Sequence, residues 1–297
     1  MSNRVYELVT NDIISKLETV NPSDYQKPWF NIGVSPYNAI SKKNYRGVNF
    51  IMLGANAYQS KGYTSFKQWQ EKDCMVRKGE KSHLAVFWKI NQYEDEDTGK
   101  EKTVPLLRYY RVFNSEQVDG DFARQMEQQK LRELNELDPI AEADKLIEGY
   151  LQGERIKNDW SDRACYIPSL DKIEMPQLRQ FRDAQSFYNV FFHEMTHSTG
   201  AEKRLERDLS GGFNSKSYAK EELVAELGAA MLCGAINLEQ RPRIDHAQYI
   251  AGWLTGLRSD PKFVIQASAQ AQKAVDYIQQ RAGFFWDWNG NPTPELF

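Results

Sequence analysis

The chain has 297 residues and a formal net charge of −3, a length that allows one large domain or two ordinary ones. Its three cysteines form no Cys-x-x-Cys pair, which argues against a disulfide scaffold. No stretch is apolar over the length of a bilayer span, and the N-terminal residues contain no apolar signal core, so we expect a cytoplasmic protein.

The N-terminal half is predicted to contain a helix and a β-hairpin. Apolar residues recur at helical spacing over residues 5–17. Residues 45–53 are apolar in a pattern that does not decide between helix and strand. Residues 85–90 and 106–113 are typical of strands, and the acidic residues 93–99 between them favour a turn. We therefore expect a hairpin whose acidic tip is solvated and is not a binding site.

Basic groups are concentrated in residues 41–91, which hold ten basic side chains and three acidic ones. This segment carries +7 in a chain whose total is −3, so the remainder carries about −10. The asymmetry indicates that the first half of the chain meets a polyanion and the second half does not.

Aromatic side chains are interleaved with these basic groups. Exposed rings can stack on unpaired bases while Lys and Arg follow the phosphates, and nothing in the segment suggests readout of base edges. We therefore expect binding of single-stranded DNA with little sequence preference, although many of the rings can instead belong to a core. The candidate DNA-contacting residues are Trp29, Lys42, Lys43, Tyr45, Arg46, Arg77, Lys78, Lys81 and Trp88.

A change of composition divides the chain. Residues 121–138 are polar and rich in Gln, Glu, Lys and Leu, which is typical of a connecting helix. We expect a DNA-binding domain over residues 1–125 that folds alone, a helical linker over 126–140 and a second domain over 141–297. The second domain is predicted to open with an amphipathic helix and short strand pieces before its main helices.

The second domain contains the motif His193-Glu194-Met195-Thr196-His197. On a helix this spacing places two imidazoles on one face, with a carboxylate beside the first. Glu194 is the only charged side chain from residue 184 to 199, and a lone buried carboxylate is usually paired or catalytic. Asp183 can cap the start of this helix, and Gly200 can end it in a left-handed conformation. His193 and His197 are therefore candidate metal ligands, and Glu194 is a candidate general base.

A catalytic metal site needs a third protein ligand. The metzincin signature would place a third histidine at position 203, where this chain has Lys203, so that class is excluded. Glu222 and Glu226 share one face of a second apolar helix, and a buried pair of carboxylates needs cations. The alternative is that these carboxylates pair with an arginine such as Arg204.

The motif and the later acidic pair resemble the gluzincin metallopeptidases. That resemblance implies that Glu222 is the third ligand and that Glu226 accepts the ring N–H of His193. The spacing is longer than in the best-known gluzincins, which leaves Glu226 open as the ligand. The resemblance also implies one divalent ion, either zinc or its alternatives manganese and cobalt, with Glu194 as the catalytic base.

The whole chain resembles the ArdC-type antirestriction proteins of conjugative plasmids. The matching strings are Lys27-Pro28-Trp29, Asn38-Ala39-Ile40, Tyr45-Arg46-Gly47-Val48-Asn49, Val76-Arg77-Lys78-Gly79-Glu80-Lys81, Tyr166-Ile167-Pro168, His193 to Gly200 and Arg204-Leu205. The resemblance implies an α+β protein, in which a mixed α/β single-stranded-DNA-binding domain, as in plasmid primases of the TraC type, is joined to a zincin-like metallopeptidase domain. That second domain is expected to have a small sheet and the His-Glu-x-x-His helix.

The function implied by the resemblance is protection of an incoming plasmid strand from host restriction. Its partners would be single-stranded DNA and a protein substrate that the sequence does not identify. The alternative is a DNA-binding protein whose metal site is structural or vestigial, but an intact Glu194 favours the peptidase because a structural site has no use for a base. A DNA-processing enzyme ranks last, because no carboxylate cluster suits two-metal phosphoryl transfer.

Overall fold

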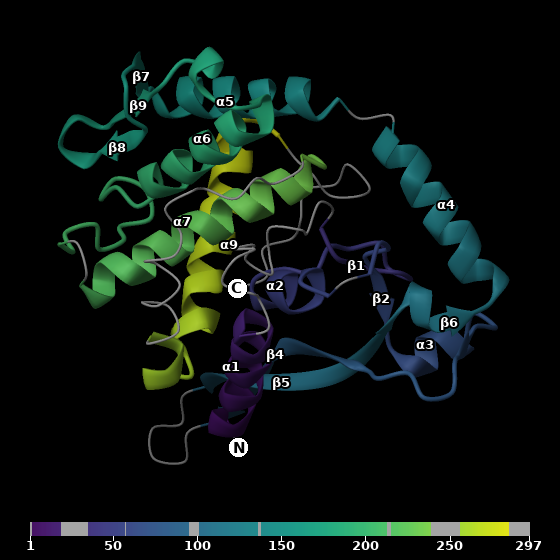
Figure 1. Ribbon diagram of the computed structural model, residues 1–297. Coiled ribbons are helices and arrows are strands. Elements are labelled where there is room, and N and C mark those ends of the chain that lie inside the picture. The colour runs from purple at the N-terminus through teal and green to yellow at the C-terminus, as the bar shows by residue number, and fades with distance from the viewer. Residues whose placement is uncertain are drawn as a thin grey trace.

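The computed structural model describes residues 2–18, 35–56, 58–94, 101–135, 138–212, 215–238 and 256–284. Figure 1 shows the sheets of the N-terminal half in the lower part of the molecule and a small sheet with adjoining helices in the upper part. Two long helices of the C-terminal half run through the centre. The α+β class predicted from the sequence is confirmed. Over the described residues, none of the helices combines the length and apolar character needed to cross a bilayer.

The N-terminal half is built around a four-stranded sheet with the order β1-β2-β5-β4, and a separate two-stranded sheet pairs β3 with β6. β1 and β2 are parallel, whereas the β2–β5 and β4–β5 pairs are antiparallel. The elements are α1 (Ser2–Glu18), β1 (Tyr37–Asn38), α2 (Val48–Gly54), β2 (Gly62–Thr64), α3 (Phe66–Gln70), β3 (Met75–Val76), β4 (His83–Glu94), β5 (Glu101–Asn114), η1 (Ser115–Gln117) and β6 (Val118–Asp119).

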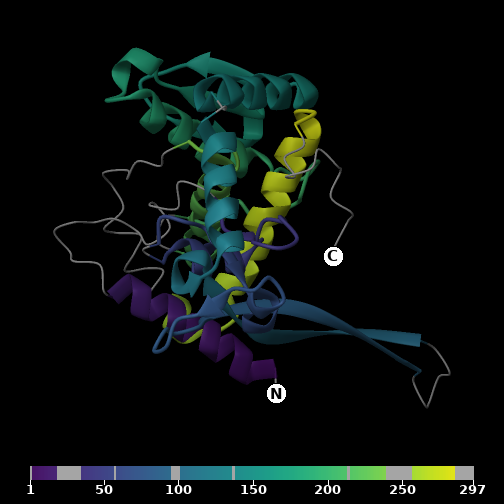
Figure 2. The ribbon, with the colours of Figure 1, turned by 90° about the vertical axis from the view of Figure 1, so that its right-hand side faces the viewer.

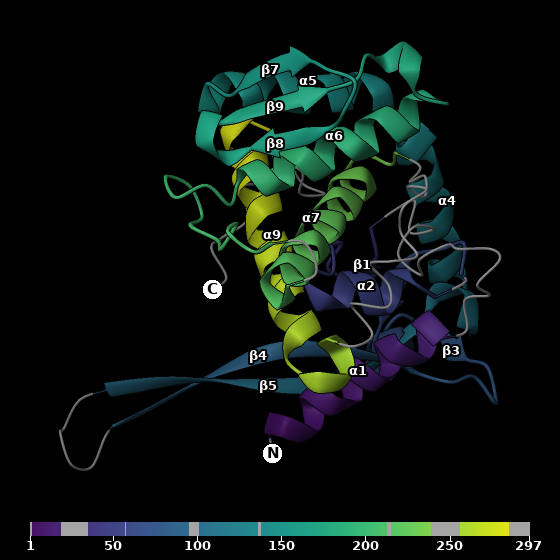
Figure 3. The same cartoon turned by 60° about the vertical axis from the view of Figure 1, so that its left-hand side comes forward.

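Strands β4 and β5 form a long hairpin that projects from the body of the protein (Figures 2 and 3). Its register runs from His83 opposite Val112 to Glu94 opposite Glu101. The expected hairpin is thus confirmed, although residues 95–100 of its acidic tip lie outside the described part of the chain. Near the body, Leu84, Val86 and Leu107 are buried on one face of the hairpin, because successive strand residues alternate between faces.

The two halves are connected along one edge of the molecule by α4 (Asp121–Asn135), as Figure 1 shows. The upper part then follows in the order α5 (Pro139–Glu154), β7 (Lys157–Trp160), β8 (Cys165–Ile167), η2 (Pro168–Leu170), β9 (Lys172–Met175), η3 (Leu178–Gln180), α6 (Ala184–Ser198), α7 (Lys216–Ala235) and α9 (Phe263–Arg281). The sheet has the order β7-β9-β8, so β8 and β7 are its edges. Pro168 begins η2, directly after the edge strand, rather than lying within a strand.

One apolar core joins the two halves. Helix α1 buries Val5, Val9 and Ile13 in the same cluster that contains the buried faces of α2, α6, α7 and α9. Hydrogen bonds cross between the halves as well, from Thr10 Oγ1 to the carbonyl of Pro261 and from the Gly47 N–H to Gln272 Oε1. This shared core argues against the expectation that residues 1–125 fold alone, because a separated segment would expose the apolar faces of α1 and α2.

Residues 45–53, which the pattern left open, form the turn before α2 and most of that helix. Gly200 departs from expectation: Thr199 ends α6 in a right-handed conformation, and Gly200 does not adopt a positive φ. A Cβ atom at Gly200 would lie 2.8 Å from the side chain of Leu209, so the glycine is needed for close packing of the following loop. The physical requirement is space rather than backbone conformation.

Candidate metal centre and nucleic-acid interface

Helix α6 forms where the sequence places it. The side chain of Asp183 accepts the N–H of Ser186 at 2.8 Å, which satisfies a donor at the start of the helix. His193 and Glu194 are buried, with 3% and 5% of their surfaces exposed. The helix therefore carries its imidazole and carboxylate groups into the interior of the upper half.

Helix α7 crosses next to α6 and brings a carboxylate to the two imidazoles. The Nε2 atoms of His193 and His197 lie 3.0 Å apart. The carboxylate oxygens of Glu222 lie 3.6 Å from His193 Nε2 and 3.5 Å from His197 Nε2. Ligand atoms of all three residues fall within 4.8 Å of one another. The three residues thus face a common point between the helices.

This donor set fits a divalent metal. With metal–ligand bonds near 2.0–2.1 Å, two donors of a tetrahedral site lie about 3.3 Å apart, close to the spacings that join the three residues. Two imidazoles and one carboxylate are also the donor types of catalytic zinc sites. The buried carboxylates of Glu221, Glu222 and Glu226 place further negative charge around the same point, where a cation is stabilising.

The close approach of α7 to α6 depends on Gly228. A Cβ atom at this position would lie 2.5 Å from the side chain of Thr196, which is fully buried. Any larger residue at position 228 would push the helices apart. Since His193 and His197 flank Thr196 on α6, the glycine sets the distance between the imidazoles and the carboxylates of α7.

Glu226 lies on the other side of the His193 ring from Glu222. Its Oε1 atom is 3.8 Å from His193 Nδ1, whereas Glu222 approaches Nε2. The geometry thus places Glu222 beside the common point and Glu226 nearest the outer nitrogen of the first histidine, at a distance longer than the hydrogen bond that the gluzincin resemblance implied.

Two residues of this site were missed by sequence reasoning. Glu221 Oε1 lies 3.0 Å from His197 Nδ1, and Arg207 donates to both oxygens of Glu221 at 2.8 and 2.9 Å. Arg204, the arginine suggested as an alternative partner of the α7 carboxylates, instead pairs with Glu154 and Asp171. The adjacent pair Glu221-Glu222 was a visible signal, but the sequence did not show which carboxylate faces which nitrogen.

The electrostatics of His197 follow from these neighbours. Burial alone would lower the pKa of its imidazole, but hydrogen bonds to Glu221 and Glu222 outweigh burial and raise the pKa to about 10. Burial would raise the pKa of Glu221, yet the hydrogen bonds from Arg207 and His197 lower it below its ordinary value.

Glu194 is oriented by the edge of the small sheet. Its Oε2 atom accepts the backbone N–H of Tyr166 in β8 at 2.9 Å. The carboxylate is thus directed along the edge strand and is not one of the three clustered donors.

The predicted DNA-contacting residues are placed in different environments. Tyr45 is 8% exposed and packs in a small core with Tyr63 and Val112, so its ring face is not available for stacking. The guanidinium of Arg46 pairs with Asp276 of α9. The other exposed candidates are Lys43, Arg77, Lys78, Lys81 and Trp88, of which Arg77 pairs with Glu80 and Asp119. Lys42 is half-buried in a turn, and Trp29 lies outside the described residues.

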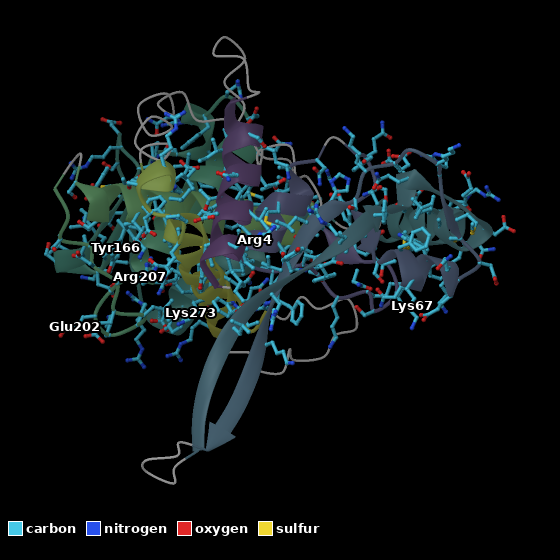
Figure 4. The ribbon with its side chains drawn as sticks, turned by 90° about the horizontal axis from the view of Figure 1, so that it is seen from below. Arg4, Lys67, Tyr166, Glu202, Arg207 and Lys273 are labelled. Carbon is cyan, nitrogen blue, oxygen red and sulfur yellow. The ribbon has the colours of Figure 1, made fainter. Side chains whose placement is uncertain are left out.

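The base of the projecting hairpin exposes aromatic and basic side chains on both of its faces. Phe87, Trp88 and Tyr109 expose 46%, 45% and 46% of their surfaces. Phe87 lies opposite Arg108 on one face of the hairpin. Trp88 and Tyr109 are diagonal neighbours on the opposite face. Seen from below, this hairpin leaves the body between the Lys67 side and the side that carries Tyr166 and Arg207 (Figure 4). We call Phe87, Trp88, Lys89, Arg108, Tyr109 and Arg111 the hairpin base.

Sequence reasoning found only part of the hairpin base. Trp88 was among the candidates, but Arg108, Tyr109 and Arg111 lie beyond the basic segment and were overlooked. Their signal was the alternation of β5, in which exposed basic and aromatic residues interrupt a buried face.

Two families match parts of the chain. Residues 141–270 match a family described as zincin-like metallopeptidases, and residues 3–113 match the N-terminal domain of anti-restriction factor ArdC. The chain is similar to the protein y4eC of Sinorhizobium fredii (strain NBRC 101917 / NGR234), with 41% identity over 289 residues that cover 92% of this chain and 91% of y4eC. It is also 32% identical over 293 residues to the DNA primase TraC of Escherichia coli, of which it spans 27%.

Crystal structures of the antirestriction ArdC protein from the R388 plasmid are similar to this structure over both halves. The metal-free form has a TM-score of 0.75 at 32% identity, covering 95% of this chain and 99% of that one. The Mn(II)-bound form has a TM-score of 0.72 at 31% identity with the same coverage. These similarities confirm the two-part fold expected from the sequence.

Proposed function

The chain belongs to the ArdC family of antirestriction proteins, and from this premise we propose that it binds single-stranded DNA and carries a metal-dependent peptidase-like site. In this proposal the N-terminal half binds DNA without sequence preference, and the protein protects incoming plasmid DNA from host restriction. The observation that carries the proposal is the convergence of His193, His197 and Glu222, with Glu194 buried beside them. The division into a DNA-binding part over residues 1–125, a linker over 126–140 and a metal-binding part over 141–297 belongs to the proposal.

The metal site in this proposal is held by His193, His197 and Glu222, with Glu226 orienting the ring of His193. When bound, a divalent metal such as zinc supplies Lewis acidity and lowers the pKa of water. Three protein donors leave a fourth tetrahedral position open, as in catalytic sites and unlike structural ones. This count supports the peptidase over the alternative, in which the protein only binds DNA and its metal site is structural or vestigial.

Single substitutions should distinguish the proposed metal ligands from the neighbouring carboxylate that does not bind the metal. His193→Ala is expected to abolish stoichiometric zinc, because it removes one of three donors, and Glu222→Ala is expected to reduce zinc severely. Glu226→Ala should retain most of the metal, since it removes a group beside Nδ1 rather than Nε2. Elemental analysis of the purified full-length variants measures this. If Glu226→Ala loses the zinc that Glu222→Ala keeps, the ligand assignment is reversed.

The DNA-binding surface in this proposal includes the hairpin base together with Lys42, Lys43, Arg77, Lys78 and Lys81. Exposed rings on both faces of a projecting hairpin offer stacking platforms, and adjacent Lys and Arg side chains can neutralise phosphates. Tyr45 is left out because it is buried, and Arg46 would have to leave Asp276 to reach a phosphate. A duplex hides its bases from such rings, so a preference for single strands is expected.

Truncating the exposed rings of the hairpin base should weaken DNA binding. We expect Trp88→Ala and Tyr109→Ala each to cost about 1–3 kcal/mol of binding free energy for a single-stranded oligonucleotide, the usual contribution of a stacked base. Fluorescence anisotropy with the full chain measures this, with a melting curve for each variant. Each phosphate contact should add about 0.7 to the log–log salt slope.

The matched control is Trp160→Ala. Trp160 is 59% exposed on β7 in the other half, so its loss should leave DNA affinity unchanged. Equal affinity of the wild-type protein for single and double strands would contradict the proposed surface. A loss in Trp160→Ala as large as that in Trp88→Ala would show that the hairpin base is not a special surface.

A further inference from the structure

Both nitrogens of the second histidine are engaged by helix α7. His197 Nδ1 lies 3.0 Å from Glu221 Oε1, and His197 Nε2 lies 3.5 Å from Glu222 Oε1. We infer that Glu221 and Arg207 are positioning residues, which hold His197 so that its Nε2 atom faces the metal. This inference rests on the proposed function, because it assigns a role toward the ion that His193, His197 and Glu222 are proposed to bind.

The protonation pattern follows from the chemistry of Glu221. An ionised carboxylate can only accept hydrogen bonds, so a short contact with His197 Nδ1 requires the proton on that nitrogen. A neutral imidazole has one N–H and one lone pair, and the lone pair is then on Nε2. That is the nitrogen turned toward His193 and Glu222. Glu221 therefore selects the tautomer in which His197 can act as a ligand.

Arg207 prevents Glu221 from becoming a competing ligand. Its Nε and Nη2 atoms donate to the two oxygens of Glu221 at 2.9 and 2.8 Å, a bidentate arrangement that fixes the plane of the carboxylate. Glu221 precedes Glu222 on α7, so an untethered Glu221 would be within reach of the same ion. The fork keeps both oxygens of Glu221 away from the point between the histidines.

Arg207 is itself anchored to the end of α6. It donates to the carbonyl of Thr196 and to Oγ1 of Thr199, both at 2.7 Å, and its side chain is only 6% exposed. The Thr196 carbonyl is in the last turn of the helix, where it also accepts the Thr199 N–H at 3.2 Å. Gly200 makes room for the loop that carries Arg207, since a Cβ atom there would lie 3.1 Å from Arg207 Nη2. The loop after α6 thus fixes Arg207, which in turn holds Glu221 against His197.

The test is zinc affinity of the full-length protein, measured by competition with a chelator. Glu221→Gln and Glu221→Ala are expected to weaken zinc binding by about 10–100-fold, the usual effect of losing a group that orients a metal ligand. Arg207→Lys should weaken it by less, because an ammonium can pair with Glu221 but cannot form the fork. In the zinc-loaded protein, the slowly exchanging Nδ1–H proton of His197 should be lost from the NMR spectrum of Glu221→Ala.

Glu202→Gln is the matched control. Glu202 is an exposed carboxylate in the same loop (Figure 4), so its replacement removes one negative charge without touching His197 and should leave zinc affinity unchanged. If Glu221→Gln binds zinc within about threefold of wild type, well short of the tenfold expected, the inference is overturned. Should Glu221→Ala fail to fold, Glu221→Gln decides alone, because it preserves side-chain size. A wild-type protein that binds no zinc would instead overturn the proposed metal site itself.

Discussion

Glu194→Gln is expected to lower any peptidase activity of the protein by about 10²–10⁴ while leaving zinc stoichiometric. The glutamine has the size of the glutamate and can still accept the Tyr166 N–H, so the local structure should persist. What it loses is the capacity to take a proton. The expected loss of activity is therefore the contribution of a general base, separated from that of the metal.

The proposal for Glu194 rests on where the structure places its carboxylate. It follows His193 on α6 but is turned to the edge strand β8, where the Tyr166 N–H at 2.9 Å fixes the direction of its carboxylate. It is not one of the three clustered donors. In the proposed function, Glu194 held in this way takes a proton from an attacking water and delivers it to the leaving amine.

The measurement compares zinc content by elemental analysis with turnover of a mixture of fluorogenic peptides. His193→Ala is the reference variant, because it should lose zinc and activity together, whereas Glu194→Gln should lose activity alone. Full activity in Glu194→Gln would contradict the hydrolytic mechanism. If the wild-type protein cleaves nothing and Glu194→Gln still protects DNA from restriction, the binding-only alternative is favoured.

Local patterns in the sequence were sufficient to predict the individual elements. The helical repeat of residues 5–17 corresponds to α1, the two apolar runs correspond to β4 and β5, and the Asp183 cap begins α6. These features depend on neighbouring residues only, through side-chain periodicity and hydrogen bonds at helix ends. The same patterns do not state what each apolar face packs against.

Long-range packing is where prediction from the sequence was incomplete. The apolar face of α1 was correctly expected, but not that it shares a core with α7 and α9 of the other half. Tyr45 looked like a stacking residue because it neighbours basic groups, yet it packs against Tyr63 and Val112, which are distant in sequence. An aromatic ring has the same propensity in a core and on a binding surface, so only the tertiary structure separates the two cases.

The candidate site shows the same division. The spacing of His193 and His197 on one helix was sufficient to pair them, because four residues make about one turn. The role of Glu221 depends on how α7 is rotated against α6, and the role of Arg207 depends on the path of a loop. Neither follows from local periodicity, and the closest approach of the helices is set by the absence of a side chain at Gly228.

Arg204→Met is expected to lower the free energy of unfolding by about 3–5 kcal/mol, the usual cost of removing one partner from a buried ion pair. The Arg204 side chain has 0% of its surface exposed and donates to Glu154 Oε2 at 2.6 Å. It also donates to both oxygens of Asp171 at 2.7 and 2.9 Å and to the carbonyl of Ser198 at 3.0 Å. One guanidinium thus ties α5, the turn after η2 and the end of α6 together.

Methionine fills much of the same volume, so the expected loss reflects charge and hydrogen bonding more than a cavity. Glu154 would remain buried, although Tyr277 and Arg281 of α9 still donate to it. Urea denaturation of the metal-free protein measures the effect. The matched control is Arg182→Met, which removes an exposed ion pair with Asp183 and should cost less than about 1 kcal/mol. A similar loss in both variants would show that burial of Arg204 has no special energetic weight.

The pH dependence of stability gives a second readout of the same network. Burial would raise the pKa of Asp171, but hydrogen bonds from Arg204, Lys203 and Tyr166 overcome it and hold the pKa well below the ordinary value of 3.8. A carboxyl whose pKa is lowered by folding contributes stability that is present above the unfolded pKa and is lost as pH falls below it. Wild-type stability should therefore decline as pH falls below about 4, and this decline should be shallower in Arg204→Met because Asp171 then has less to lose on protonation. An equally steep decline in the variant would assign the acid sensitivity to other carboxylates.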